Sequence, residues 1–151
     1  MFYKKNIIYL SCCGGHLVQL LKIAKYVKED NCLFIVNDRV DFDPQMKNKT
    51  VLITHATRNW KQIINLIEAF YYIFKYRPKV LLSTGAAPAV PFSLVSKIIG
   101  TKVIFVESLS RVTSPSLTGK IMYYIADEFY VQWPRLKKIF PSALYFGNLL
   151  E

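Results

Sequence analysis

Short apolar runs alternate along the chain with longer segments in which apolar residues recur every three or four positions. The short runs predict β-strands, and the longer segments predict amphipathic helices. We predict strands at residues 6–11, 32–36, 51–54, 80–83, 102–106, 128–131 and 143–146. We predict helices at residues 16–28, 60–75, 89–99, 117–126 and 135–139. Regular alternation of strand and helix is typical of an α/β protein with a mainly parallel sheet.

The predicted strands themselves favour a parallel sheet. The runs VLLS at 80–83 and VIFV at 103–106 are apolar at nearly every position, which indicates that helices cover both faces of the sheet. The 151 residues contain no repeat or low-complexity tract, so we predict one α/β domain spanning 1–151, with a long polar loop at 37–50. Ligands of such sheets bind at the carboxyl ends of the strands. In this chain that rule selects the junctions 11–16, 83–91, 107–120 and 132–134.

The first junction reads SCCGGH and joins a predicted strand to a predicted helix. Gly14 and Gly15 allow a sharp turn and a close approach to a ligand, and the start of a helix favours an anion there. His16 is a candidate catalytic base because imidazole titrates near neutral pH. The spacing matches neither GxGxxG nor a P-loop. An anion site and a purely structural turn are therefore both open interpretations.

The second junction repeats this logic. Ser83 ends a predicted buried strand, and Thr84, Gly85 and further small residues follow it. Such a loop can lie close to a ligand or to another chain, although small residues can also serve close packing alone. Two glycine-bearing turns at one sheet edge favour a binding cleft more than either turn does by itself.

The third junction carries the most polar side chains. Glu107 directly follows an apolar strand, Arg111 lies four residues later, and Lys120 lies near the start of the next helix. A carboxylate in this position can act as a base or bind hydroxyl groups. The alternative interpretation is a Glu107–Arg111 ion pair that holds the loop.

The predicted helix at 60–75 has too many apolar residues for a single buried stripe. It is too short, and too interrupted by polar residues, to span a bilayer. An apolar surplus flanked by basic residues suits a membrane surface or a subunit contact, and a thick core helix is the alternative. The candidate contact residues are Trp60, Phe70, Tyr71, Phe74 and Arg77.

Net charge narrows the possible partners. Lysine and arginine number 20 against 10 aspartates and glutamates, so the formal charge is +10. That charge favours the phosphates of a nucleic acid, an anionic lipid or a diphosphate ligand. Nucleic acid is disfavoured, because the aromatic residues gather in one apolar helix instead of alternating with basic residues on an exposed sheet.

The three cysteines, Cys12, Cys13 and Cys32, lie in or beside predicted strands and are interpreted as small buried side chains. Their spacing matches no zinc site, and no DxD pair lies near the sheet edge, so no metal and no cofactor are expected. No apolar run reaches 18 residues, and no signal-peptide core follows Met1. The expected location is therefore the cytosol or the cytosolic face of a membrane.

Four stretches resemble a known family: SCCGGHLVQLLKI, PKVLLSTGAAPAVP, ESLSRVTSPSLTGKIMYYIADEFYVQW and ALYFGNLLE. They are similar to the accessory, membrane-associated subunits of split glycosyltransferases. This family includes bacterial capsule and exopolysaccharide proteins and the eukaryotic subunit that recruits the dolichol-linked N-acetylglucosamine transferase. A more distant similarity is to the single-chain enzyme that adds N-acetylglucosamine to the peptidoglycan lipid intermediate. Its GGH motif is matched by Gly14, Gly15 and His16, and the glutamate of its HEQN motif by Glu107.

The resemblance implies a Rossmann-like domain equivalent to the N-terminal half of a GT-B glycosyltransferase. A separate catalytic subunit would bind the UDP-sugar, and this chain would bind a polyprenyl-diphosphate-linked sugar at the cytoplasmic face of the membrane and be inactive alone. His16 and Glu107 would assist the acceptor hydroxyl, and the expected binding residues are Gly14, Gly15, Ser83, Thr84, Gly85, Arg111 and Lys120. The alternatives are a membrane scaffold that touches no substrate and a free-standing nucleotide-binding protein, which the incomplete phosphate fingerprint disfavours.

Overall fold

The computed structural model describes residues 4–37, 48–56 and 60–150, and its centre is a six-stranded sheet. The strands follow the order β3-β2-β1-β4-β5-β6, and every neighbouring pair is parallel. The strands are β1 (Ile7–Ser11), β2 (Cys32–Asn37), β3 (Thr50–Ile53), β4 (Val80–Ser83), β5 (Lys102–Val106) and β6 (Glu128–Tyr130). The helices are α1 (Gly15–Val27), α2 (Gln62–Tyr76), α3 (Ala89–Ile98), α4 (Leu117–Ile125) and the 3-10 helix η2 (Pro134–Lys138).

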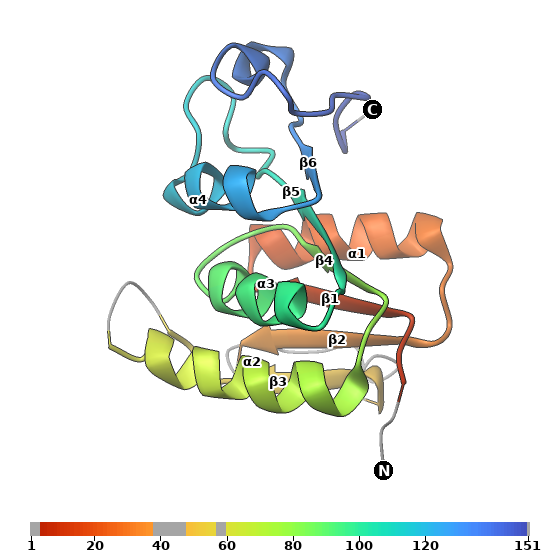
Figure 1. The fold of residues 1–151 in the computed structure, drawn as a ribbon. Helices are drawn as coiled ribbons and strands as arrows, with labels where there is room; N and C mark the ends of the chain where they lie inside the picture. The colour runs from red at the N-terminus through yellow and green to blue at the C-terminus, as the bar shows by residue number, and fades with distance from the viewer. Residues whose placement is uncertain (1–3, 38–47, 57–59, 151) are drawn as a thin grey trace.

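Helices cover both faces of the sheet, with α1 on one side and α2 and α3 on the other (Figure 1). Successive strand residues point to opposite faces, and each face has its own core. Ile8 and Leu10 of β1 pack in the cluster that α2 and α3 cover, whereas Tyr9 between them packs with Leu20 of α1. A third cluster joins β5 and β6 to α3, α4 and η2. This two-sided burial explains why the strands read as continuous apolar runs.

The strand order reverses between β1 and β4, and this point positions the two glycine-bearing turns. Leu10 pairs with Ser83 in the sheet, so both strands end side by side. Directly beyond them the Thr84 hydroxyl oxygen lies 3.3 Å from the Ser11 hydroxyl oxygen. The chain segments that follow β1 and β4 therefore lie next to each other, at the place where open α/β sheets bind ligands.

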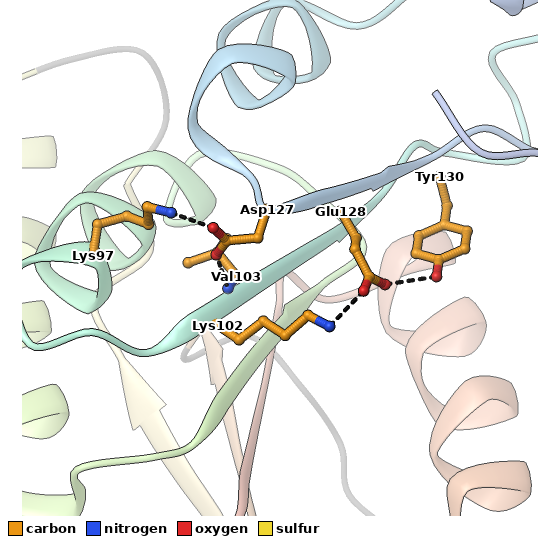
Figure 2. Close-up of polar contacts among 6 residues, drawn as sticks. All are labelled: Lys97, Lys102, Val103, Asp127, Glu128 and Tyr130. Atoms are coloured by element: carbon orange, nitrogen blue, oxygen red, sulfur yellow. Dashed lines mark hydrogen bonds and ion pairs between the residues drawn. The ribbon is translucent and has the colours of Figure 1, made fainter. Parts of the chain in front are cut away.

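Two acidic side chains fix the start of β6 (Figure 2). The Asp127 carboxylate accepts hydrogen bonds from the Lys97 ammonium group and from the backbone N–H of Val103. Lys102 pairs with Glu128 at 2.5 Å, and the Tyr130 hydroxyl donates to the same carboxylate at 2.7 Å. These contacts tie β6 to β5 and to the end of α3.

The predicted strand at 143–146 is wrong. Only Leu144 pairs with the sheet, in a single bridge to Tyr130. The ladder stops there because β6 is three residues long, and the chain leaves it for η2. The predicted helix at 135–139 is a 3-10 helix one residue earlier, and α2 starts at Gln62 rather than at Trp60. Most of the predicted polar loop, 38–47, lies outside the described residues.

Candidate functional site

A cleft of about 690 Å³ opens at the carboxyl edge of the sheet. Its walls come from the segments that follow β1, β3, β4 and β5 and from the first turns of the helices. Each of the four α-helices contributes a residue near its start, namely His16, Gln62, Val90 and Leu117. A helix start carries unpaired N–H groups and partial positive charge. The cleft therefore suits an anionic group.

The turn at Gly14 lies between Cys13 and His16, which both line this cleft. Gly14 has a φ of +82°, which glycine adopts without strain, and it precedes α1. Among the described residues no side chain caps the start of α1 by a hydrogen bond. Gly15 is the first residue of the helix, and no packing neighbour lies within 4 Å of the position that a Cβ would take there. An approaching anion can therefore reach the first N–H groups of α1.

His16 is held over the β4 turn. Its Nδ1 lies 2.8 Å from the carbonyl oxygen of Thr84, which can only accept a hydrogen bond, so Nδ1 carries the proton. The Thr84 hydroxyl in turn donates to the carbonyl oxygen of His16 at 2.8 Å. In the neutral form of the ring, the nitrogen without a proton is then Nε2, on a side chain that lines the cleft. This arrangement suits a general base.

Ser83 and Gly85 shape this turn. The Ser83 hydroxyl oxygen accepts from the N–H of Gly85 at 3.2 Å, and Ser83 is fully buried. Gly85 has a φ of +119°, and the His16 ring lies over it. The structure thus brings together six predicted residues. His16 lies in the cleft wall, and the other five form the turns around it: Gly14, Gly15, Ser83, Thr84 and Gly85.

Glu107 lies beneath the loop that follows β5 and does not line the cleft. It is 1% exposed, and its carboxylate accepts from the N–H of Ser108 and from both the N–H and the hydroxyl of Ser116. The Ser116 hydroxyl oxygen also accepts from the N–H of Gly119 and so caps α4. Glu107 therefore shapes the loop and the start of α4 from below.

The alternative interpretation of this junction, an ion pair between Glu107 and Arg111, is not found in the described part of the chain, because Ser108 and Ser116 satisfy the carboxylate. Arg111 instead lines the cleft and is exposed. It is the single arginine or lysine among the described residues of the cleft wall. Lys120 is exposed on the first turn of α4, outside that wall.

Cys12 and Cys13 also line the cleft, and Cys32 is buried in β2. Burial raises the pKa of the Cys12 thiol to about 11, so this group stays protonated and is a poor nucleophile. Within the described ranges no three His, Cys, Asp or Glu side chains gather in a way that could hold a metal ion.

The outer face of α2 is apolar. Trp60 and Ile67 are 70% and 65% exposed, and Ile63, Phe70, Tyr71 and Phe74 are exposed beside them. Polar Asn65 is fully buried on the inner face. Asn65 and Glu68 both bond to Thr54 at the end of β3. A helix at a protein–water surface normally has polar residues on its outer face and apolar residues on its inner face. Because α2 has apolar residues outside, its outer face favours contact with an apolar surface.

A family model described as "Oligosaccharide biosynthesis protein Alg14 like" matches residues 36–149. The chain belongs to this Alg14-like family. The match confirms the resemblance seen in the sequence. Among its relatives, the human UDP-N-acetylglucosamine transferase subunit ALG14 is 27% identical, over 96% of this chain and 83% of that protein. The subunit of the same name from Candida albicans is 37% identical, over 91% of this chain and 74% of that protein.

Solved structures confirm the fold class. MurG from Acinetobacter baumannii superposes with a TM-score of 0.72 at 16% identity, and the UDP-GlcNAc 2-epimerase from Methanocaldococcus jannaschii with 0.70 at 14%. Each match covers 95% of this chain and 45% of the longer one. This Alg14-like chain thus has the Rossmann-like fold of one part of those proteins and spans less than half of their length.

Sequence reasoning missed several residues of the site. Gln19 of α1 accepts hydrogen bonds from the N–H of Leu109 and from the amide of Gln132, and the Trp133 indole donates to the carbonyl oxygen of Leu109 at 2.7 Å. These contacts hold the loop that carries Arg111. The missed residues in the cleft region are Asn37, the last residue of β2, and His55, which follows β3 at the same sheet edge. The rule that places ligands at strand ends selects both positions when it is applied to β2 and β3 as well.

Proposed function

We propose that this chain is the acceptor-binding and membrane-docking subunit of a two-component glycosyltransferase. One observation carries the proposal: His16 and the starts of four helices meet in a cleft beside the apolar outer face of α2. The helix starts and Arg111 suit a diphosphate, and the apolar face suits the membrane in which a polyprenyl carrier resides. The names of the relatives support a UDP-N-acetylglucosamine transferase subunit as the closer assignment.

The reaction would use His16 as the base. The acceptor hydroxyl attacks the anomeric carbon of the donor sugar, the bond from that carbon to the UDP oxygen breaks, and UDP leaves. Nε2 of His16 takes the hydroxyl proton. Glu107 would act as a positioning residue, since its carboxylate holds Ser116 and α4 rather than facing the substrate. Lys120 would attract the diphosphate from the rim of the cleft.

The separate catalytic subunit would supply the UDP-sugar site, and this chain would be inactive alone. Within residues 4–37, 48–56 and 60–150, no helix is long and apolar enough to cross a bilayer. Attachment at the cytoplasmic face would use the exposed side chains of Trp60, Phe70, Tyr71 and Phe74, with Arg77 at the end of α2 near lipid phosphates. The setting we propose is capsule or exopolysaccharide assembly, which rests on the sequence resemblance, whereas the family description names oligosaccharide biosynthesis.

The test is sugar transfer from UDP-N-acetylglucosamine and other UDP-sugars to a polyprenyl-diphosphate sugar. The chain alone, a candidate catalytic subunit alone and the two together are compared. Transfer only with both present is expected, and full activity of the chain alone contradicts the proposal. His16→Ala should lower turnover about 100- to 10,000-fold with the complex intact, as loss of a general base does. The control is Tyr26→Ser, which alters an 82% exposed side chain at the far end of α1. A scaffold that touches no substrate would tolerate both changes equally well.

A further inference from the structure

The protein has two histidines, and both line the cleft. His16 begins α1, and His55 follows β3 on another wall. Nothing in the proposed reaction yet uses His55. The contacts on its ring decide which nitrogen can serve a ligand.

Asn37, at the end of β2, sets the protonation of His55. The backbone N–H of Cys13 can only donate, and it donates to Oδ1 of Asn37 at 2.7 Å. That bond fixes the orientation of the Asn37 amide, so its nitrogen Nδ2 faces Nδ1 of His55. An amide nitrogen donates, so Nδ1 of His55 accepts and the ring proton of the neutral form lies on Nε2.

The backbone before His55 is also held. Glu68 of α2 accepts from both the N–H and the hydroxyl of Thr54 at 2.9 Å. The amide of Asn65 donates to the carbonyl oxygen of Thr54, also at 2.9 Å. His55 is therefore anchored through its ring by β2 and through its neighbour by α2, which is the support that a preorganised ligand group requires.

The two imidazoles have opposite polarity. Nδ1 of His16 carries a proton toward the Thr84 carbonyl, which makes Nε2 a hydrogen-bond acceptor. Nδ1 of His55 accepts from Asn37, which makes Nε2–H a donor. One cleft thus contains one imidazole suited to take a proton and one suited to bind an oxygen anion.

We propose that Nε2–H of His55 donates a hydrogen bond to a diphosphate oxygen of the lipid-linked acceptor, and that Asn37 is the residue that positions it. The inference rests on the proposed function of the cleft. A diphosphate is favoured over a sugar hydroxyl because a phosphate oxygen only accepts, and because Gln62, at the start of α2, lines the same cleft as His55. His16 is then left to serve the acceptor hydroxyl.

The test uses the full chain with ¹⁵N-labelled histidine and geranyl diphosphate as a short, water-soluble probe. Nitrogen spectra at a pH where both rings are neutral should show the proton on Nε2 of His55 and on Nδ1 of His16. Adding the probe should shift the Nε2–H signal of His55. His55→Ala should weaken binding about 10- to 100-fold, as loss of a hydrogen bond to a charged group does. His55→Gln, which keeps an N–H near that place, should lose less.

Asn37→Asp tests the positioning role. The carboxylate still accepts from Cys13 but cannot donate to His55, so the proton of the neutral ring should move to Nδ1 and the affinity should fall as in His55→Ala. A purely structural Asn37 would leave the His55 proton on Nε2. If the probe shifts His16 but not His55, and His55→Ala binds equally well, this inference is overturned while the proposed function stands. If the probe does not bind the unchanged chain, both are overturned.

Discussion

At the scale of single residues, the chemistry of His16 depends on the residue beneath its ring. A Cβ built on Gly85 would lie 3.2 Å from both Cε1 and Nδ1 of His16, closer than side chains normally pack. Gly85 also has a φ of +119°, a conformation that residues with a side chain rarely adopt. The glycine therefore sets the height of the imidazole above the β4 turn, and with it the direction of Nε2.

Gly85→Ala should displace the His16 ring and lower glycosyl transfer by about 10- to 100-fold, because catalysis is sensitive to shifts of less than an ångström. The strained backbone should also lower the free energy of unfolding by roughly 1–3 kcal/mol. Steady-state kinetics of the two-subunit complex and urea unfolding of the chain measure these effects.

Gly100→Ala is the matched control for Gly85→Ala. Gly100 has a φ of +76° and nothing within 4 Å of its Cβ position, and it lies between α3 and β5, outside the cleft wall. The Gly100→Ala variant should be less stable than the unchanged chain but should transfer the sugar at the same rate. Equal losses of activity in both variants would show that backbone strain, not the His16 contact, limits catalysis.

At the scale of elements, the loop between β5 and α4 is held by a buried carboxylate and a serine. The Ser116 hydroxyl donates to Glu107 and accepts from the N–H of Gly119, so one side chain satisfies the carboxylate and caps the helix. Its removal leaves a buried charge with fewer donors and a helix start without its cap.

Ser116→Ala should therefore lower the free energy of unfolding by about 1–3 kcal/mol. Because Arg111 lies in this loop, Leu117 directly follows it and both line the cleft, acceptor binding should weaken as well. Urea unfolding and a binding isotherm with the prenyl diphosphate probe measure the two effects. Ser114→Ala, at an exposed position of the same loop, should stay within about 0.5 kcal/mol of the unchanged chain. Similar losses in both variants would argue against the capping role.

The start of β6 makes the fold sensitive to acid. Burial opposes ionisation of Asp127, but hydrogen bonds from Lys97 and from the N–H of Val103 outweigh it and lower the pKa of this carboxyl below its usual range. A lowered folded-state pKa stabilises the protein above the unfolded pKa of about 4, and this contribution is lost as pH falls through the folded value. Glu128 shows the same direction, because Lys102 and Tyr130 bond to its carboxylate and lower its pKa.

Asp127→Asn should remove part of this acid sensitivity. The free energy of unfolding of the unchanged chain should fall between about pH 5 and pH 3, and the variant should be less stable near neutral pH but lose less on acidification. Urea unfolding across this range gives both curves (Figure 2 shows the contacts that change). Parallel curves would show that Asp127 has the same pKa in the folded and unfolded chains.

The sequence predicted those elements whose pattern depends on burial alone. Residues 80–83 and 102–106 form strands with the predicted bounds, because apolar runs between two helix layers allow few alternatives. The segment at 143–146 has a similar pattern, but a strand also needs a neighbour long enough to pair with it. The partners of Glu107 depend on how one loop folds back on itself, and the amide orientation of Asn37 depends on a contact with Cys13 from another segment. A pattern of apolar and polar positions contains neither.

At the scale of the whole molecule, the apolar outer face of α2 continues across its neighbours. Exposed apolar residues also lie on α3 and α4, at Leu94, Ile98, Leu117, Ile121 and Tyr124. Leu117 and Ile121 belong to both this surface and the wall of the cleft. A lipid-linked acceptor could therefore keep its diphosphate in the cleft while its hydrocarbon chain leaves along an apolar path. The formal charge of +10 adds attraction to anionic lipid.

Ile63→Glu combined with Ile67→Glu should release the chain from membranes without unfolding it. Both side chains are exposed on α2, so the free energy of unfolding should change little, whereas each apolar contact with lipid that is lost should weaken binding about 10-fold or more. Flotation with vesicles that contain anionic lipid, at low and high salt, measures the binding. The control is Tyr26→Glu, which changes an exposed aromatic residue of α1 on the other side of the sheet.

If the unchanged chain does not float but the double variant fails to retain the catalytic subunit, this face is a protein contact instead. The distinction matters for catalysis, because only a membrane-bound face would hold the cleft at the depth where the diphosphate of a polyprenyl carrier lies.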